Sequence, residues 1–132
     1  MDGSVPAGGA WGDIVGYSRA VRRGNFVFVA GTTAAGPDGR ALHPGDPGAQ
    51  ARVILERIEA ALVKLGARLK DVVETRIYVC DIAQWEAVGR THGSVFGAIR
   101  PVTTMLEVSR LIAPDLLVEI AATAVLADST GS

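Results

Sequence analysis

The sequence predicts a single α+β domain in which a mixed β-sheet carries two helices on one face. Short β-prone runs alternate with two longer stretches of helical spacing, in the order β-β-α-β-α-β-β. The chain has 132 residues, the size of one domain. Hydrophobic residues make up 48% of it and charged residues 20%, a globular composition. We therefore expect one domain over residues 1–132, with flexible Gly- and Ser-rich tails at 1–12 and 127–132.

The first half of the chain predicts a β-hairpin followed by a helix. Residues 17–22 and 25–30 are rich in β-prone side chains and flank a turn at Arg23 and Gly24. Asp46 is placed to cap the helix, Pro47 suits its first turn and Gly66 suits the position after its end. Its apolar residues recur at helical spacing and predict one buried stripe, formed by Ala51, Ile54, Leu55, Ile58, Ala61, Leu62 and Leu65.

The second half predicts a strand, a helix and two further strands. The third strand spans residues 72–80, and Asp81 then caps a helix that ends near Phe96, before Gly97. The last two strands span residues 103–108 and 117–126, joined through a turn at Pro114 and Asp115.

Apolar residues occur on both faces of this predicted sheet. Phe26 and Phe28 alternate with Val27 and Val29, so each face of that strand is apolar. Two helices cover only one face, and large exposed apolar patches are unusual on monomers. The sequence therefore predicts a homo-oligomer in which copies of the chain cover the second face.

Charge and cysteine content exclude several classes of function. The net charge of −1 gives no basic footprint for nucleic acid or anionic lipid. The single Cys80 excludes an internal disulfide framework. No apolar run reaches the roughly 18 residues of a membrane span, and the N-terminal residues lack the pattern of a signal peptide. We expect a cytoplasmic protein without nucleic-acid or membrane partners.

Three segments together resemble one known family. Residues 16–21 read Gly-Tyr-Ser-Arg-Ala-Val, residues 100–108 read Arg-Pro-Val-Thr-Thr-Met-Leu-Glu-Val, and residues 117–121 read Leu-Val-Glu-Ile-Ala. This pattern is similar to the RidA (YjgF) family, whose best-studied members hydrolyse reactive imines and enamines. The resemblance implies a chorismate-mutase-like fold and a homotrimer with clefts between subunits that bind a small-molecule substrate.

Glu119 is the first candidate for catalysis. A carboxylate between apolar strand residues is either directed into a cleft, exposed to solvent, or paired with an arginine across the sheet. The resemblance favours the cleft, where Glu119 would orient or deprotonate water and Tyr17 would contribute its ring and hydroxyl. It also implies substrate binding by Gly31 and Thr32, at the end of the second strand. A strand tyrosine and a strand-ending glycine are otherwise common packing features.

Thr103 is the main departure from the family. Deaminating members carry an arginine there, whose planar fork binds the carboxylate of an imino acid. Losing such a contact costs roughly 2 to 5 kcal/mol of binding free energy, enough to change the substrate class. Arg76 and Arg100 are candidates to replace it. The resemblance also assigns pocket positions to Gly89, His92, Thr103, Thr104 and Met105.

These residues support two main functions and a weaker third. The first is hydrolysis or tautomerisation of a small imine, enamine or related carbonyl compound, distinct from standard 2-iminobutanoate or 2-iminopropanoate deamination. The second is a ligand-binding or regulatory trimer without catalysis. An endoribonuclease, a label often given to this family, is disfavoured by the acidic balance and the lack of a basic groove. No metal site and no cofactor is expected, and His92 and the Arg19, Arg22 and Arg23 cluster are most simply surface or packing residues.

Overall fold

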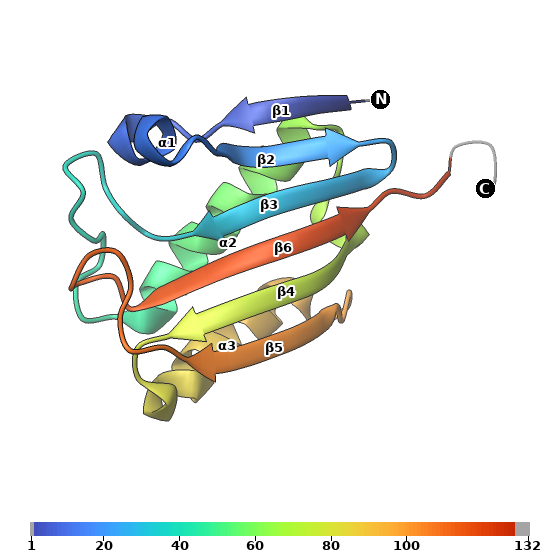
Figure 1. Cartoon of the computed structure of the whole chain (residues 1–132). Coiled ribbons are helices and arrows are strands. Elements are labelled where there is room, and N and C mark those ends of the chain that lie inside the picture. The colour runs from blue at the N-terminus through green and yellow to red at the C-terminus, as the bar shows by residue number, and fades with distance from the viewer. Residues whose placement is uncertain (1, 129–132) are drawn as a thin grey trace.

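The computed structural model describes residues 2–128, which form one six-stranded sheet with two long helices on one side (Figure 1). The sheet has the order β1-β2-β3-β6-β4-β5. All neighbouring strands are antiparallel except β4 and β5, which are parallel. The elements are β1 (Asp2–Pro6), α1 (Gly9–Val15), β2 (Ser18–Arg23), β3 (Phe26–Thr32), α2 (Pro47–Lys64), β4 (Val72–Val79), α3 (Trp85–Phe96), β5 (Val102–Glu107) and β6 (Val118–Val125), with 3-10 turns η1 (Leu69–Asp71) and η2 (Ile82–Gln84).

The predicted order β-β-α-β-α-β-β is confirmed as β2-β3-α2-β4-α3-β5-β6. The prediction of a flexible tail over residues 1–12 is wrong for the residues that the structure describes. Residues 2–6 form β1, which pairs with β2 along the sheet edge, and α1 follows it. Backbone hydrogen bonding to β2 gives this Gly- and Ser-rich segment an order that its composition does not indicate. Most of the other predicted tail lies outside the described residues.

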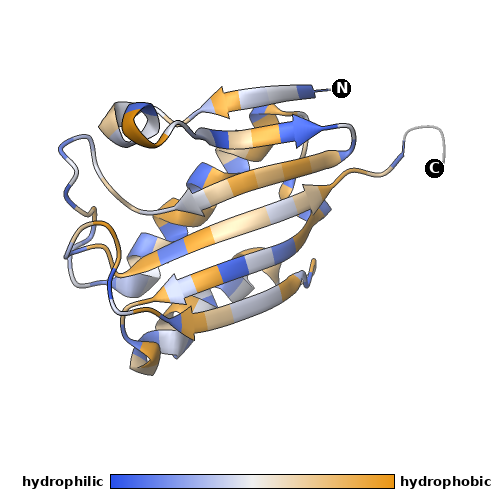
Figure 2. Ribbon diagram, in the orientation of Figure 1, coloured by the Kyte–Doolittle hydropathy of each residue, from blue (hydrophilic) through white to orange (hydrophobic). Residues whose placement is uncertain are grey.

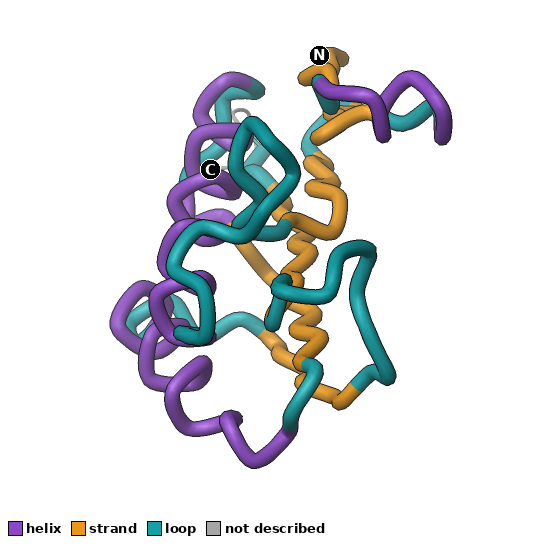
Figure 3. The backbone as a smooth tube through the Cα atoms, turned by 90° about the vertical axis from the view of Figure 1, so that its left-hand side faces the viewer, coloured by secondary structure: helices purple, strands orange, loops and turns teal. Residues whose placement is uncertain are grey.

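The helix α2 begins and ends as its sequence predicts. The Asp46 side chain accepts a hydrogen bond from the Ala49 amide at 3.0 Å, and Pro47 occupies the first turn. Gly66, just beyond the end of the helix, has a φ of 84°, a left-handed conformation that would be strained in a residue with a side chain. The predicted apolar stripe is buried against the sheet, so this helix and α3 form one layer, seen edge-on in Figure 3.

The two faces of the sheet differ sharply in their cover. Val27 and Val29 are buried under the helices, whereas Phe26 and Phe28 of the same strand remain 50% and 48% exposed. The two phenyl rings stack in parallel, with their centroids 6.2 Å apart. Figure 2 shows the resulting apolar colour along most of β3. The prediction that both faces carry apolar residues is therefore confirmed, and we call the side away from α2 and α3 the open face.

The last strand, β6, lies in the middle of the sheet between β3 and β4. Val118, Ile120 and Ala122 are buried on the helix side, so the intervening Glu119 points to the open face. Among residues 2–128, no helix is both long enough and apolar enough to cross a bilayer.

Candidate functional site

Glu119 sits at a place where three strands meet on the open face. It pairs with Tyr78 on β4 and lies beside the irregular end of β3, where the register shifts between Val29 and Thr32. Its carboxylate rests directly over Gly31: a Cβ at Gly31 would overlap Glu119 Oε2 and lie 2.9 Å from the Glu119 carboxyl carbon. Gly31 is thus required because the Glu119 carboxylate packs directly against its backbone. Glycine permits such a close approach because it has no side chain.

The environment of Glu119 makes its carboxyl group a better proton acceptor. Burial raises the pKa of Glu119 above its ordinary value, because a half-buried carboxylate loses part of its hydration. The positive charge of Arg19 acts on the Glu119 pKa in the opposite direction and with less weight. A carboxylate with a raised pKa suits general base catalysis near neutral pH.

Arg19 belongs to the candidate site, although the sequence did not single it out. The sequence predicts a solvated edge for Arg19, Arg22 and Arg23, but Arg19 Nη1 donates a hydrogen bond to Thr32 Oγ1 at 3.3 Å. Val5 pairs with Ala20 and Pro6 pairs with Ser18, so Arg19 is the extra residue of a β-bulge. Bulges re-aim side chains, and alternation along a strand gives no sign of them. The resemblance did carry one signal, since the family usually has Gln at this position.

Thr32 supports the site from inside the fold. The side chain is 1% exposed, and its hydroxyl donates to the Ala30 carbonyl at 2.8 Å while accepting from Arg19. The hydroxyl is therefore engaged within the chain, and it fixes Arg19 and the end of β3. Tyr17 lies half-buried between α1 and β2, and its hydroxyl makes no hydrogen bond with another described residue.

A second cluster joins β4, β5 and α3 on the helix side of the sheet. Thr75 Oγ1 lies 2.9 Å from His92 Nε2 and 2.8 Å from Thr103 Oγ1. Thr103 Oγ1 in turn donates to the Pro101 carbonyl at 3.2 Å. Because the Thr103 hydroxyl proton is used in the bond to Pro101, the Thr75 hydroxyl must donate its own proton to Thr103 Oγ1. His92 Nε2 then donates to Thr75 Oγ1. Burial lowers the pKa of His92, which favours this neutral ring over an imidazolium.

Strand register separates the candidate residues on β5. Thr103 pairs with buried Thr75 and Met105 pairs with buried Ile77, so both side chains face the helices, and Met105 packs on the core. Thr104 lies between them and faces the open side. Gly89 lies on α3, one turn from Trp85.

The predicted site residues therefore form two groups within one chain. Glu119, Gly31, Thr32 and Tyr17 belong to the β2, β3 and β6 region, whereas His92 and Thr103 belong to the β5 and α3 region. The strand β4 lies between β6 and β5, and Glu119 and Thr103 point to opposite faces. One chain does not bring these two groups into a single pocket.

The two arginines considered as replacements for the missing cation have different surroundings. Arg76 is held in an ion pair with Glu74 at 2.8 Å on the open face, two residues along β4 from Tyr78. Arg100 lines a cavity of about 400 Å³ together with His92, Phe96 and Pro101. Its φ of 58° is unusual for a residue with a side chain. Arg100 is thus the one of the two that lies with the β5 and α3 group.

Cys80 is half-buried, and its Sγ contacts the Leu116 carbonyl at 3.5 Å. Across residues 2–128, no group of three or more His, Cys, Asp or Glu side chains is placed to hold a metal ion.

Comparison with known proteins shows which family this chain is similar to. The family model described as Endoribonuclease L-PSP matches residues 9–126. The 3-aminoacrylate deaminase RutC of Acinetobacter baylyi is 34% identical over 82% of this chain and 85% of its own length. The crystal structure of Rv2704 from Mycobacterium tuberculosis, a member of the YjgF/YER057c/UK114 family, is 52% identical with a TM-score of 0.86, covering 96% of this chain and 100% of its own. That of E. coli TdcF with bound serine is 26% identical with a TM-score of 0.78 and covers 94% of each chain.

Proposed function

Because this chain belongs to the RidA (YjgF) family, we propose that it hydrolyses or tautomerises a small imine, enamine or related carbonyl compound in a cleft between subunits. The observation that carries this proposal is the half-buried Glu119 carboxylate, with its raised pKa, lying over Gly31. Among residues 2–128, Glu119 is the carboxylate whose oxygen occupies the position that the Cβ atom of a glycine would take.

In the hydrolytic reaction, Glu119 accepts a proton from water as the water oxygen bonds to the imine carbon. Glu119 delivers this proton to the imine nitrogen, which gives a neutral carbinolamine. Glu119 then accepts the hydroxyl proton of the carbinolamine and passes it to the nitrogen as the C–N bond breaks, so ammonia leaves, a carbonyl group remains and the enzyme ends unchanged. In the tautomerase variant, the same carboxylate moves a proton between carbon and nitrogen without adding water.

A second copy of the chain would complete the site. The β5 and α3 group of one subunit, with His92, Thr103 and Arg100, would face the Glu119 group of another. The separation of these groups within one chain supports this arrangement, as does the apolar open face that needs a cover. We propose a homotrimer, as the family resemblance implies.

The substrate would differ from 2-iminobutanoate and 2-iminopropanoate. The Thr103 hydroxyl is hydrogen-bonded to Thr75 and to the Pro101 carbonyl, and it carries no positive charge to bind a carboxylate. The substrate would therefore lack a free α-carboxylate, or its carboxylate would bind elsewhere, with Arg100 the nearest candidate in the β5 and α3 group. One relative is named as a 3-aminoacrylate deaminase, and the crystal structure of another contains bound serine. Both compounds are small, which supports a substrate of a few carbon atoms.

The test compares two imines and four forms of the protein. 2-Iminobutanoate, made in place by a threonine dehydratase, and the imine of the matching α-keto amide differ only in the carboxylate. The decay of the imine absorbance is followed with wild type, Glu119→Gln, Thr103→Arg and the control Glu59→Gln, which removes an exposed charge from α2. We expect wild type and Glu59→Gln to prefer the amide by roughly tenfold or more, Thr103→Arg to reverse that preference, and Glu119→Gln to be inactive on both.

Two other outcomes distinguish the alternatives. Rapid wild-type turnover of 2-iminobutanoate, lost in Glu119→Gln, would contradict the substrate class and direct attention to Arg100. Inactivity of every form on both imines would favour the non-catalytic ligand-binding or regulatory trimer, for which the changes at Gly89, Thr103 and Met105 argue. An endoribonuclease is the least supported function, because the net charge of −1 does not favour binding of a polyanion.

A further inference from the structure

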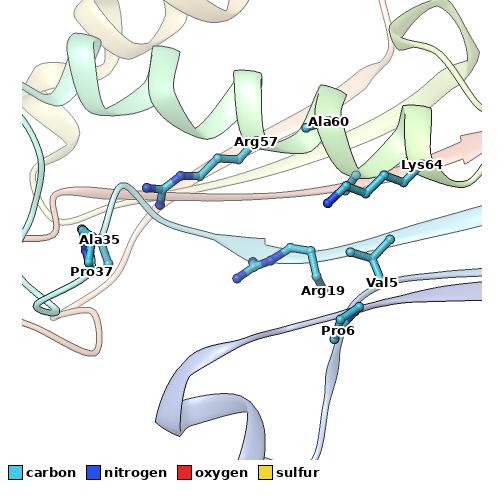
Figure 4. Close-up of a pocket in the computed structure, with 10 residues that line it drawn as sticks. Val5, Pro6, Arg19, Ala35, Pro37, Arg57, Ala60 and Lys64 are labelled. Carbon is cyan, nitrogen blue, oxygen red and sulfur yellow. The ribbon is translucent and has the colours of Figure 1, made fainter.

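We propose that a cationic cavity between α2 and the edge of the sheet binds the oxyanion group of a small molecule, through Arg19, Arg57 and Lys64. The cavity has a volume of about 440 Å³, and its lining strand residues belong to β1 and β2, which lie across β3 from the strand that carries Glu119. Figure 4 shows Arg57 and Lys64 extending from α2 and Arg19 extending from the strand that faces it. The proposal for this cavity does not rest on the proposed catalytic function.

The charges that line the cavity are of one sign. Its lining contains two guanidinium groups and one ammonium group, and no Asp or Glu. Among residues 2–128 the ion pairs are Arg76 with Glu74 and Arg90 with Glu86, so none of the three lining cations is in one. Burial lowers the pKa of Arg57, and the nearby charge of Arg19 lowers it further. This repulsion is the kind that a bound anion removes.

The two guanidinium groups are held in place before any ligand arrives. Arg57 Nη1 donates to the Thr33 carbonyl at 2.7 Å, and Arg19 Nη1 donates to Thr32 Oγ1 at 3.3 Å. A guanidinium group has five N–H donors, so each retains donors for a ligand. Fixed, planar donors bind carboxylate and phosphate oxygens at a lower entropic cost than mobile ones do.

Apolar side chains also line the cavity. Val5, Pro6, Ala60 and Pro37 supply apolar surface beside the cations, which lowers the local dielectric and strengthens their attraction for an anion. A volume of this size holds a small molecule. Three cations around one cavity favour a group with more than one negative oxygen, as in a phosphate monoester or a dicarboxylate.

The two sites share one residue. Arg19 lines the cavity and also acts on the pKa of Glu119. An anion in the cavity would offset the Arg19 charge, so the pKa of Glu119 should rise further when the cavity is occupied. Occupancy of one site would then change the proton affinity of the other.

Isothermal titration calorimetry tests the proposal with inorganic phosphate and sodium succinate as probes, at an ionic strength held constant with sodium chloride. The proteins are wild type, Arg57→Gln, Lys64→Ala and the control Arg52→Ala, an exposed arginine of the same helix that contacts Ser94. We expect saturable binding to wild type and Arg52→Ala, roughly tenfold or more weaker binding to Arg57→Gln, and a smaller loss in Lys64→Ala. Binding of phosphate alone indicates a phosphoryl ligand, and binding of succinate alone indicates a dicarboxylate.

The absence of saturable binding by both probes would overturn the proposal, as would equal binding by wild type and Lys64→Ala. Lys64 is exposed and makes no hydrogen bond with another described residue, so its replacement leaves the fold intact and keeps the test decisive if Arg57→Gln is unstable. Circular dichroism of each variant confirms that the comparison is between folded proteins.

Discussion

At the scale of single residues, the position of Glu119 depends on the missing side chain of Gly31. The backbone at Gly31 does not require glycine, because its φ lies outside the left-handed region. What requires glycine is the carboxylate above it, whose Oε2 and carboxyl carbon occupy the space of a methyl group. Since that carboxylate is the free end of a flexible side chain, an added methyl group displaces Glu119 and leaves the strand in place.

Gly31→Ala should therefore impair the site more than the fold. We expect the free energy of unfolding to fall by about 1 kcal/mol or less, while the pKa of Glu119 returns toward its ordinary value as the carboxylate moves into water. NMR titration of the Glu119 carboxyl carbon and thermal unfolding measure the two effects. Gly93→Ala is the control, because its Cβ meets open space on α3 and should stabilise the helix by about 0.5–1 kcal/mol. An unchanged Glu119 titration in Gly31→Ala would contradict the close approach.

The raised pKa of Glu119 also predicts how stability depends on pH. A carboxyl group with a higher pKa in the folded state contributes most to stability below its unfolded pKa of about 4.3, and loses that contribution as the pH rises through the folded value. Glu119→Gln removes this loss. The melting temperature of Glu119→Gln relative to wild type should therefore increase as the pH is raised from about 4 to 7. A difference that stays constant over this range would show that Glu119 titrates as an exposed carboxylate.

At the scale of elements, the joint between β4, β5 and α3 depends on one threonine. The parallel pairing of β4 with β5 requires a crossover, which α3 supplies on the helix side. Thr75 is fully buried at the centre of this joint and links His92 on α3 with Thr103 on β5. These hydrogen bonds fix the edge strand relative to the helix that precedes it.

Thr75→Val keeps the shape of the side chain and removes both hydrogen bonds. We expect the free energy of unfolding to fall by about 1–3 kcal/mol, because the half-buried His92 loses its hydrogen-bond partner and Thr103 loses its link to β4. Urea denaturation measures the change. Thr104→Val is the matched control on the open side of the neighbouring strand, where Thr104 is exposed and makes no hydrogen bond through its side chain with the described residues, and we expect a change within about 0.5 kcal/mol. Equal effects of the two substitutions would remove the proposed role of Thr75.

The elements also show what could be read from the sequence. The stripe and caps of α2 and the β-prone runs of β3, β4 and β6 are local signals, and they were confirmed. β1 was missed because Gly, Ser and Pro indicate no strand, and only pairing with β2 orders it. Arg19 was missed because a bulge, which depends on the partner strand, turns it toward Thr32 and Arg57. The grouping of Thr103 with His92 required the register of β4 and β5, which no local pattern contains.

At the scale of the whole molecule, the open face is the largest feature that one chain leaves incomplete. Phe26, Phe28, Val73 and Leu106 are each at least 43% exposed on strands of this sheet, and Val102 at its edge is 69% exposed. The opposite face is covered by α2 and α3. Covering the open face with other copies would bury this apolar surface and bring the two groups of site residues into reach of each other.

Phe28→Asp should separate the copies and abolish their joint site. In sedimentation equilibrium, we expect wild type at three times its chain mass of 13.7 kDa and Phe28→Asp at the mass of one chain. A charge on the open face would need desolvation in the assembly, which is costly. Val63→Asp is the control. Val63 is 49% exposed and Phe28 is 48% exposed, but Val63 lies on α2, in the helix layer and away from the open face. A trimeric Phe28→Asp would mean that another surface joins the copies.

The central position of β6 has a consequence for how this protein is made. β1, β2 and β3 form one half of the sheet, and β4 with β5 forms the other, but β6, which joins them, follows both halves in the sequence. Until β6 has left the ribosome, the two halves have no shared strand, and the facing edges of β3 and β4 expose unpaired backbone groups. The sheet is therefore completed only after its other five strands have been synthesised. A messenger truncated before the codon for Val118 would yield two unjoined half-sheets prone to pair with other chains.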